Sequence, residues 1–302
     1  MSSYLDQRDL LNGTIPVSPL TAEASARRYS RPVGSRAQGW LLVESPTPPP
    51  VETTEWLMEC GVRVPELGKI KAGQYLVEDL GDEQLCSQPS LTAYQSLWRA
   101  WESFAHIPIP PRLENSSLTL DASLFANELE IFKSSWILGL RAGSLTQAEE
   151  HELETACISL AKEAAKGPLC VQHRDFHSRN ILRINDGLAF LDHQDMRKGP
   201  LFYDLGSLLT DAYVDLSKEV ISFLEERFEI LGRRYRLSPE EASHRLHASS
   251  LQRVLKVLGT FGKLISEGRE EYTEPEARAR KHATRLLNNS PFEVFSAWVL
   301  PQ

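Results

Sequence analysis

One stretch in the second half of the chain constrains the fold more than any other, because it contains a complete β-hairpin signal. The apolar runs Ile181–Ile184 and Leu188–Leu191 flank an Asn-Asp-Gly turn, a sequence that favours positive φ and closes antiparallel strands. Asn180 precedes the first run and Asp192 follows the second. The hairpin therefore predicts that Asp192 folds back beside Asn180.

A polar loop with a fixed spacing leads into this hairpin. A short strand through Val171 is followed by His173-Arg174-Asp175, and Asn180 lies five residues after the aspartate. This is the H-R-D-x-x-x-x-N pattern of a kinase catalytic loop. Asp, Asn and Gly taken singly are ordinary turn formers. The ordered combination of strand, loop, spaced asparagine, hairpin and second aspartate predicts a phosphotransfer site.

Each of these residue types has a chemical reason to be there. Phosphoryl transfer from ATP mainly requires positioning and charge neutralisation. Asp192 and Asn180 supply the hard oxygen ligands that Mg²⁺ prefers, and would hold the ion against the nucleotide phosphates. Asp175 would act as the general base that takes the proton of the attacking hydroxyl, and is expected to be ionised. His173 and His177 could suggest a second metal site, but this interpretation is less favoured because the H-E-x-x-H pattern is absent.

Composition indicates a soluble enzyme. The 302 residues, 41% of them hydrophobic, can bury a substantial core in one large or two modest domains, and the net charge of −8 argues against a nucleic-acid partner. Four separated cysteines predict reduced, buried thiols. The first twenty residues lack a leader pattern and no apolar run is long enough for a bilayer, so the sequence predicts a cytoplasmic protein without a membrane partner.

The pattern along the chain predicts an α+β fold with two lobes, divided after Gly81. Residues 1–81 read as a small β-rich lobe and residues 82–302 as a larger, mostly helical lobe. The first lobe is expected to contain strands at Arg27–Pro32, Gly39–Ser45 and Gln74–Gly81, with a helix at Thr53–Cys60 stopped by Gly61. Long helices are expected at Ser90–Phe104, Asp121–Leu140 and Thr146–Ala165, and an apolar stripe of core residues at Leu251, Val254, Leu255, Leu258 and Phe261.

The segments HRDFHSRNIL and LDHQDMRKGPLFYDLGSLLTDAY resemble the aminoglycoside phosphotransferase and choline kinase superfamily. The bacterial anomeric sugar kinases, which act on N-acetylmuramate and N-acetylglucosamine in cell-wall recycling, are similar along the whole chain, through AEASARRYSR, LVEDLGD, NELEIFKSSW and LQRVLKVLGTFGKL. The resemblance implies a protein-kinase-like bilobal fold, ATP and Mg²⁺ as cofactors, and a small amino sugar as substrate.

The same resemblance implies roles for individual residues. Asp175 corresponds to the catalytic base, and Asn180 and Asp192 to the magnesium ligands. Glu128 corresponds to the helix lining the sugar side of the cleft, with simple solvent exposure as its alternative. Arg179 is a further substrate candidate, and His173 and Asp204 are expected to support the catalytic loop. Adenine is expected at the backbone of the hinge residues Val77, Glu78 and Leu80, and the phosphates under the loop Glu23–Arg28, which includes Ser25, Arg27 and Arg28.

Several positions depart from the family pattern. The stretch GWLLVES has no lysine where a protein kinase pairs one with the ATP phosphates. The phosphate loop has Ala22-Glu23 where the sugar kinases usually have Gly-Asp, and Ala26 and Ser30 where aromatic residues are usual. His193 replaces the common Phe after the magnesium aspartate. The missing lysine leaves open how the α and β phosphates are held. The other changes leave open the nucleotide affinity, the substrate preference and whether catalysis is weakened.

The sequence therefore predicts an ATP- and magnesium-dependent kinase for the anomeric hydroxyl of an amino sugar. An aminoglycoside- or choline-type kinase is the nearest alternative, and it would need an anionic pocket for its cationic substrate. The arginines Arg174, Arg179 and Arg197 instead favour an anionic or neutral substrate. A nucleotide-binding pseudokinase that acts as a scaffold is the alternative from another class. The sequence leaves the oligomeric state open.

Overall fold

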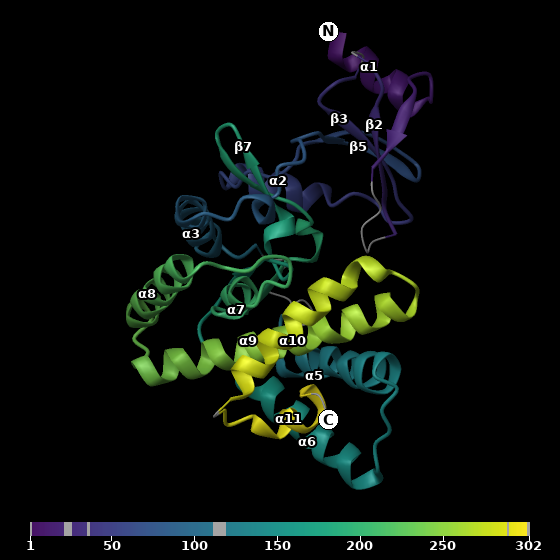
Figure 1. The fold of residues 1–302 in the computed structure, drawn as a ribbon. Helices are drawn as coiled ribbons and strands as arrows, with labels where there is room; N and C mark the ends of the chain where they lie inside the picture. Colours follow the sequence, from purple (N-terminus) through teal and green to yellow (C-terminus); the bar gives the residue numbers. More distant parts are fainter. Residues whose placement is uncertain (1, 21–25, 35–36, 111–118, 289, 301–302) are drawn as a thin grey trace. The chain divides into compact units, whose positions relative to one another are not determined.

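The computed structural model describes residues 2–20, 26–34, 37–110, 119–288 and 290–300 (Figure 1). The chain forms two compact units, one of residues 1–85 with 180–194 and one of residues 86–179 with 195–302. The first contains a five-stranded antiparallel sheet and the second is mostly helical, which confirms the predicted α+β class. The grouping differs from the predicted lobes in two respects: residues 82–85 and residues 180–194 belong with the first unit.

The sheet of the first unit has the strand order β1-β2-β3-β5-β4, with every neighbouring pair antiparallel. Leu42 on β3 faces Leu76 on β5, and both are buried together with Leu10 and Leu11 of helix α1. Helix α1 and strands β1 and β4 were not predicted. The elements of this sheet and its covering helix are α1 Ser2–Leu11, β1 Val17–Pro19, β2 Arg28–Pro32, β3 Trp40–Glu44, β4 Leu67–Lys71 and β5 Gln74–Glu78.

Helix α2, Val51–Glu59, begins earlier than the sequence pattern predicted. Pro50 takes the N-cap position, so the helix starts directly after the proline run instead of at Thr53. At its other end Gly61 has a φ of 77°, a left-handed conformation that glycine adopts without steric cost. The prediction that Gly61 stops this helix is therefore confirmed.

The predicted hairpin is present as β7, Ile181–Ile184, and β8, Gly187–Phe190. A two-residue Asn185-Asp186 turn joins the strands, and the positive φ falls on Gly187, at 137°. Backbone hydrogen bonds attach both strands to the first unit: Arg183 N–H donates to the Glu83 carbonyl at 2.8 Å, and Phe190 N–H donates to the Arg63 carbonyl at 2.9 Å. These bonds explain why the hairpin groups with the first unit.

The second unit is built around the long helix α9, Pro239–Ser266, which packs against several other helices and lies beside α10 (Figure 1). The predicted stripe Leu251, Val254, Leu255, Leu258 and Phe261 is buried in its core, as predicted. The remaining elements are α3 Leu91–Ala105, α5 Ala122–Ile131, η3 Phe132–Leu140, α6 Gln147–Ala164, β6 Leu169–Gln172, β9 Arg197–Pro200, α7 Tyr203–Leu209, α8 Lys218–Arg234, α10 Thr273–Leu287 and α11 Ser296–Val299.

The helix predicted at Asp121–Leu140 is not one continuous α-helix. Asp121 caps α5, and from Phe132 the chain continues as a π-helix, η3. Helix α9 packs closely on this segment through glycines: a Cβ atom on Gly259 would lie 2.6 Å from the backbone N of Phe132, and one on Gly262 would lie 2.7 Å from the carbonyl oxygen of Ser135. The two backbones therefore approach at a distance that only glycine permits.

This close packing gives a stability prediction. Gly259→Ala is expected to lower the free energy of unfolding by about 1–3 kcal/mol, because the added methyl group overpacks a backbone contact. Gly139→Ala is the control, since Gly139 is exposed in η3 and its nearest neighbour is a single carbonyl oxygen at 3.3 Å. Chemical denaturation of both variants measures the difference. Equal stability of the two would mean that the contact yields without cost.

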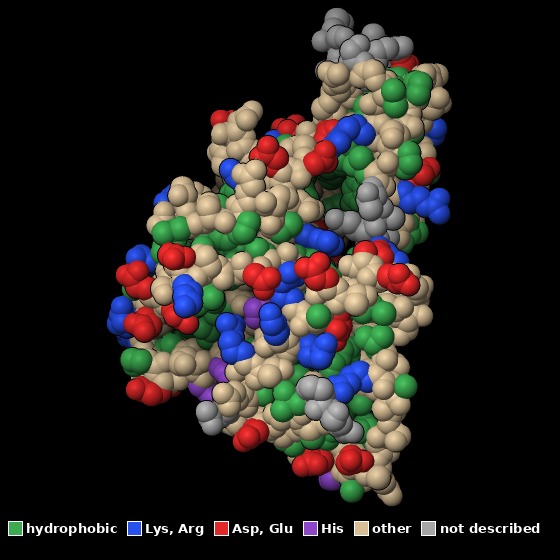
Figure 2. Space-filling model, viewed as in Figure 1, with side chains coloured by type: hydrophobic (Ala, Val, Ile, Leu, Met, Phe, Trp, Pro, Cys, Tyr) green, Lys and Arg blue, Asp and Glu red, His purple; other side chains and the backbone are tan. Residues whose placement is uncertain are grey.

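Acidic and basic side chains are interspersed on the face shown in Figure 2. All four cysteines are free thiols; Cys157 and Cys170 are buried, whereas Cys60 and Cys86 are only partly buried, which corrects the prediction that all are core residues. Among the described residues, no helix has the length and apolar character needed to span a membrane.

Candidate active site

The predicted catalytic loop follows strand β6 in the second unit and is held by Asp204. Its Oδ2 accepts a hydrogen bond from His173 N–H at 2.6 Å, and its Oδ1 accepts one from Arg174 N–H at 3.0 Å. Arg174 has a φ of 79°, a left-handed conformation that is costly for a residue with a side chain. Burial raises the pKa of Asp204 to about 7, although the two N–H donors lower it. Asp204 thus fixes the strained backbone directly before Asp175.

The other end of the loop is held in the same way. Ser178 N–H donates to Asp211 Oδ2 at 2.7 Å, and the Arg179 guanidinium lies 4.2 Å above the ring centre of Tyr213. The ring of His177 also contacts Tyr213, and burial lowers the pKa of His177 to about 3 despite the nearby charge of Asp175. His177 is therefore neutral at neutral pH.

Asp175 faces two cations from helix α9. Its Oδ1 lies 2.9 Å from Arg253 Nη2 and 3.8 Å from Lys256 Nζ, while 31% of its side chain stays exposed. Burial by itself would raise the pKa of Asp175, but the charges of Lys256 and Arg253 outweigh burial and hold it well below its ordinary value. Arg253 Nε also donates to Ser207 Oγ at 3.1 Å. Asp175 is thus an ionised carboxylate with one oxygen fixed by a buried guanidinium.

Glu128 belongs to the same group of charges. Only 4% of the residue is exposed, so the alternative that it is a solvent-exposed helix residue is wrong. Its Oε1 lies 2.9 Å from Arg174 Nη2 and 3.3 Å from Lys256 Nζ, and its Oε2 accepts a hydrogen bond from Gln252 Nε2 at 3.0 Å. Burial would raise the pKa of Glu128, but the charges of Lys256 and Arg174 lower it. Glu128 is accordingly ionised and fully paired.

Gln252, Arg253 and Lys256 complete this group of charges, although the sequence pattern predicted no role for them. All three lie on α9, inside the stretch LQRVLKVLGTF whose apolar residues were predicted as core. Gln252 and Arg253 are buried at 0% and 4% exposure. Charged side chains are rarely buried unless they are paired. The occurrence of these polar residues inside a stretch predicted as core was therefore the signal that they have buried partners.

The predicted metal ligands lie together in the first unit. Leu191 N–H donates to the carbonyl of Asn180 at 2.8 Å, so the hairpin brings Asp192 next to Asn180 as the turn signal predicted. Asp192 has a φ of 56°. Its Oδ1 accepts a hydrogen bond from Gln194 Nε2 at 2.5 Å and lies 3.3 Å from Arg27 Nη1. One carboxylate and one amide are hard oxygen donors of the kind that Mg²⁺ takes together with waters and phosphates.

His193, the replacement for the usual Phe, has a defined contact. The residue is buried, and its Nε2 lies 2.8 Å from Thr54 Oγ1 on α2. It therefore ties the turn that follows Asp192 to helix α2. His173 and His177 belong to no such metal site: the described part of the chain contains no group of three or more His, Cys, Asp or Glu side chains that could hold a metal ion.

At the predicted hinge, the side chain of Glu78 is already occupied. Its carboxylate pairs with Arg63 at 2.6 and 2.7 Å and accepts the Glu66 N–H at 3.1 Å. Val77 and Leu80 are partly exposed. Any contribution of Glu78 to a ligand would therefore come from its backbone.

In the predicted phosphate loop, the structure separates the two arginines. Arg27 contacts Asp192, whereas Arg28 is exposed at the start of β2. Ser25, like Ala22 and Glu23, lies outside the described residues. Of the two candidates, Arg27 is the one placed near a predicted metal ligand.

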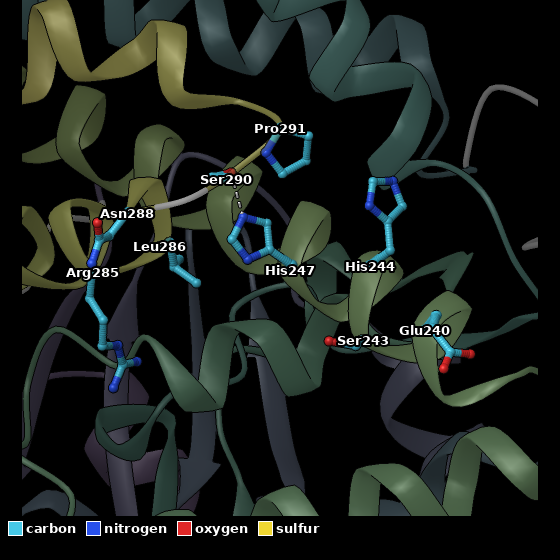
Figure 3. Close-up of a pocket in the computed structure, with 9 residues that line it drawn as sticks. All are labelled: Glu240, Ser243, His244, His247, Arg285, Leu286, Asn288, Ser290 and Pro291. Atoms are coloured by element: carbon cyan, nitrogen blue, oxygen red, sulfur yellow. Dashed lines mark hydrogen bonds between the residues drawn. The ribbon is translucent and has the colours of Figure 1, made fainter.

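A hollow of about 370 Å³ elsewhere in the second unit contains none of the predicted site residues (Figure 3). His244 and His247 lie on successive turns of α9, and Ser290 Oγ is 2.8 Å from His247 Nε2. Arg285 and Glu240 stand at opposite ends of the hollow. This hollow offers no counterpart of the loop chemistry at Asp175.

The chain is similar to known phosphotransferases and kinases in sequence and in fold. Residues 51–246 match the model of the phosphotransferase enzyme family, APH. The chain is 26% identical to N-acetylmuramate/N-acetylglucosamine kinase of Pseudomonas putida, covering 94% of this chain and 88% of that protein, and 27% identical to the Pseudomonas aeruginosa protein of the same name, covering 84% and 78%. Its fold is similar to ADP-bound aminoglycoside phosphotransferase APH(2'')-Ib, with a TM-score of 0.60, 16% identity, and coverage of 96% and 98%. The predicted kinase-like fold is confirmed.

Proposed function

Because the chain belongs to the phosphotransferase enzyme family, we propose that it is an ATP- and magnesium-dependent kinase that phosphorylates the anomeric hydroxyl of an amino sugar. One observation carries the proposal. Asp175 is an ionised carboxylate held by Arg253, and it lies five residues before Asn180. The carbonyl of Asn180 accepts a hydrogen bond from Leu191 N–H, directly before Asp192. Base and metal ligands thus occur in the order and chemistry that phosphoryl transfer requires.

In this proposal, Asn180 and Asp192 would hold Mg²⁺, which neutralises charge on the ATP phosphates when bound. Arg27 would supply the phosphate-binding cation that the missing lysine supplies in a protein kinase. It already lies 3.3 Å from Asp192, so it is held at the ligand pair. The backbone of residues 77–80 would contact adenine.

Asp175 would bind and deprotonate the acceptor hydroxyl. The hydroxyl oxygen bonds to the γ-phosphorus, the bond from that phosphorus to the bridging oxygen of ADP breaks, and the proton passes to Asp175. Its low pKa makes it a weak base, which suits a loose transition state in which the proton leaves late. Arg253 would orient the carboxylate by holding Oδ1.

The sugar assignment is supported by the two relatives named as N-acetylmuramate/N-acetylglucosamine kinases. The structure adds an argument against a cationic acceptor such as choline or an aminoglycoside. Such a substrate needs unpaired carboxylates. Glu128, which shares Lys256 with Asp175, is neutralised by Arg174 and Lys256.

A phosphotransfer screen tests the proposal. The purified chain is incubated with Mg-ATP and, separately, N-acetylmuramate, N-acetylglucosamine, choline and an aminoglycoside. We expect turnover with at least one sugar, and ³¹P NMR should show an anomeric phosphate. Turnover with choline or the aminoglycoside alone would support that alternative, and Mg-ATP binding without any turnover would support the scaffold alternative.

A further inference from the structure

We propose that Lys256 binds a negatively charged group of the acceptor and thereby makes a sugar carrying a carboxylate the preferred substrate. This inference rests on the proposed function and assigns to it a residue that determines specificity. It concerns the ion-paired cluster of the second unit, which consists of Glu128, Arg174, Asp175, Arg253 and Lys256.

Lys256 differs from the two arginines of this cluster because it forms ion pairs but no hydrogen bond to any described residue. Arg174 donates to Glu128 at 2.9 Å, and Arg253 donates to Asp175 at 2.9 Å and to Ser207 at 3.1 Å. Lys256 lies within ion-pair distance of Glu128 and Asp175, at 3.3 and 3.8 Å, but makes no hydrogen bond to any described residue. An ammonium group has three N–H donors and no acceptor capacity.

Lys256 is also nearly buried. Only 12% of the Lys256 side chain is exposed, and burial lowers the pKa of its ammonium group, although Asp175 and Glu128 raise it. A nearly buried ammonium gains more from an anionic ligand than an exposed lysine does, because water competes less for it. The other two acids in contact with the loop, Asp204 and Asp211, accept backbone N–H groups of the loop.

Lys256 also lies close to Asp175, the proposed base. Lys256 Nζ is 3.8 Å from the carboxylate that would receive the acceptor hydroxyl, so any acceptor bound at Asp175 lies within reach of the ammonium group. The charge of the phosphates would be met by Mg²⁺ at Asn180 and Asp192 and by Arg27. Lys256, beside Asp175, is therefore available to bind the acceptor. Of the two sugars in the relatives' names, N-acetylmuramate carries a carboxylate and N-acetylglucosamine does not.

The test compares the two sugars in the full-length enzyme. Lys256→Met should lower kcat/KM for N-acetylmuramate at least about 10-fold more than for N-acetylglucosamine, mainly through KM, because it removes a hydrogen bond to a charged group. Lys263→Met is the matched control, since Lys263 lies on the same helix with 64% of its side chain exposed. It should leave the ratio of the two kcat/KM values unchanged.

Two outcomes overturn the inference. An equal loss with both sugars would mean that Lys256 acts on the transferred phosphoryl group or only on Asp175, and no loss with either sugar would remove it from the site. If Lys256→Met does not fold, Lys256→Gln replaces it. If the parent enzyme phosphorylates neither sugar, the proposed function fails. Calorimetric binding of the two sugars to parent and variant then decides the inference: selective loss of N-acetylmuramate binding supports it, and any other result contradicts it.

Discussion

We expect Asp175→Asn to lower kcat by at least ~10²-fold, which is the typical contribution of a general base. An amide is isosteric with the carboxylate and its oxygen can still accept the hydrogen bond from Arg253, so the fold should be retained. The amide, however, cannot take up a proton at neutral pH. Steady-state turnover with the sugar selected by the screen, together with thermal melting, measures both effects.

The control for this variant is Asp186→Asn. Asp186 is exposed in the turn of the β7–β8 hairpin, so the same change of charge occurs away from the cluster at Asp175. Its turnover should equal that of the parent. If Asp175→Asn also retained full turnover, Asp175 would not be the base.

The second large effect is expected for Asp192→Asn, on metal-dependent ATP binding. The substitution exchanges the one anionic magnesium ligand of the pair for a neutral one. Affinity for Mg-ATP should fall at least about 10-fold, since even the loss of a group that supports a metal ligand typically costs this much. Calorimetric titration of ATP with and without Mg²⁺ measures the loss.

The two variants should be impaired at different steps. Asp175→Asn should bind Mg-ATP as the parent does and fail in turnover, whereas Asp192→Asn should already fail in binding. Asp186→Asn again serves as control, because it lies on the same hairpin. If Asp192→Asn kept the full magnesium dependence of ATP binding, the assignment of Asp192 as a ligand would be wrong.

The sequence by itself determined the local parts of this protein. The Asn-Asp-Gly turn and its flanking apolar runs determined the hairpin that returns Asp192 to Asn180, because both strands and their turn lie within a dozen residues. Gly61 ended its helix and the stripe on α9 formed core, since helix ends and periodicity depend on near neighbours. The kinase-like fold followed from the same local signals together with the family resemblance.

Only the tertiary structure decided which charges surround Asp175. Arg253 lies 78 residues from it and Glu128 lies 46 residues from Arg174, so neither pairing has a local signal. The close approach of α9 to the π-helix, through Gly259 and Gly262, is likewise a contact between distant segments. Buried ion pairs depend on how whole helices pack, because a charge is tolerated in the interior only where its partner arrives from another element.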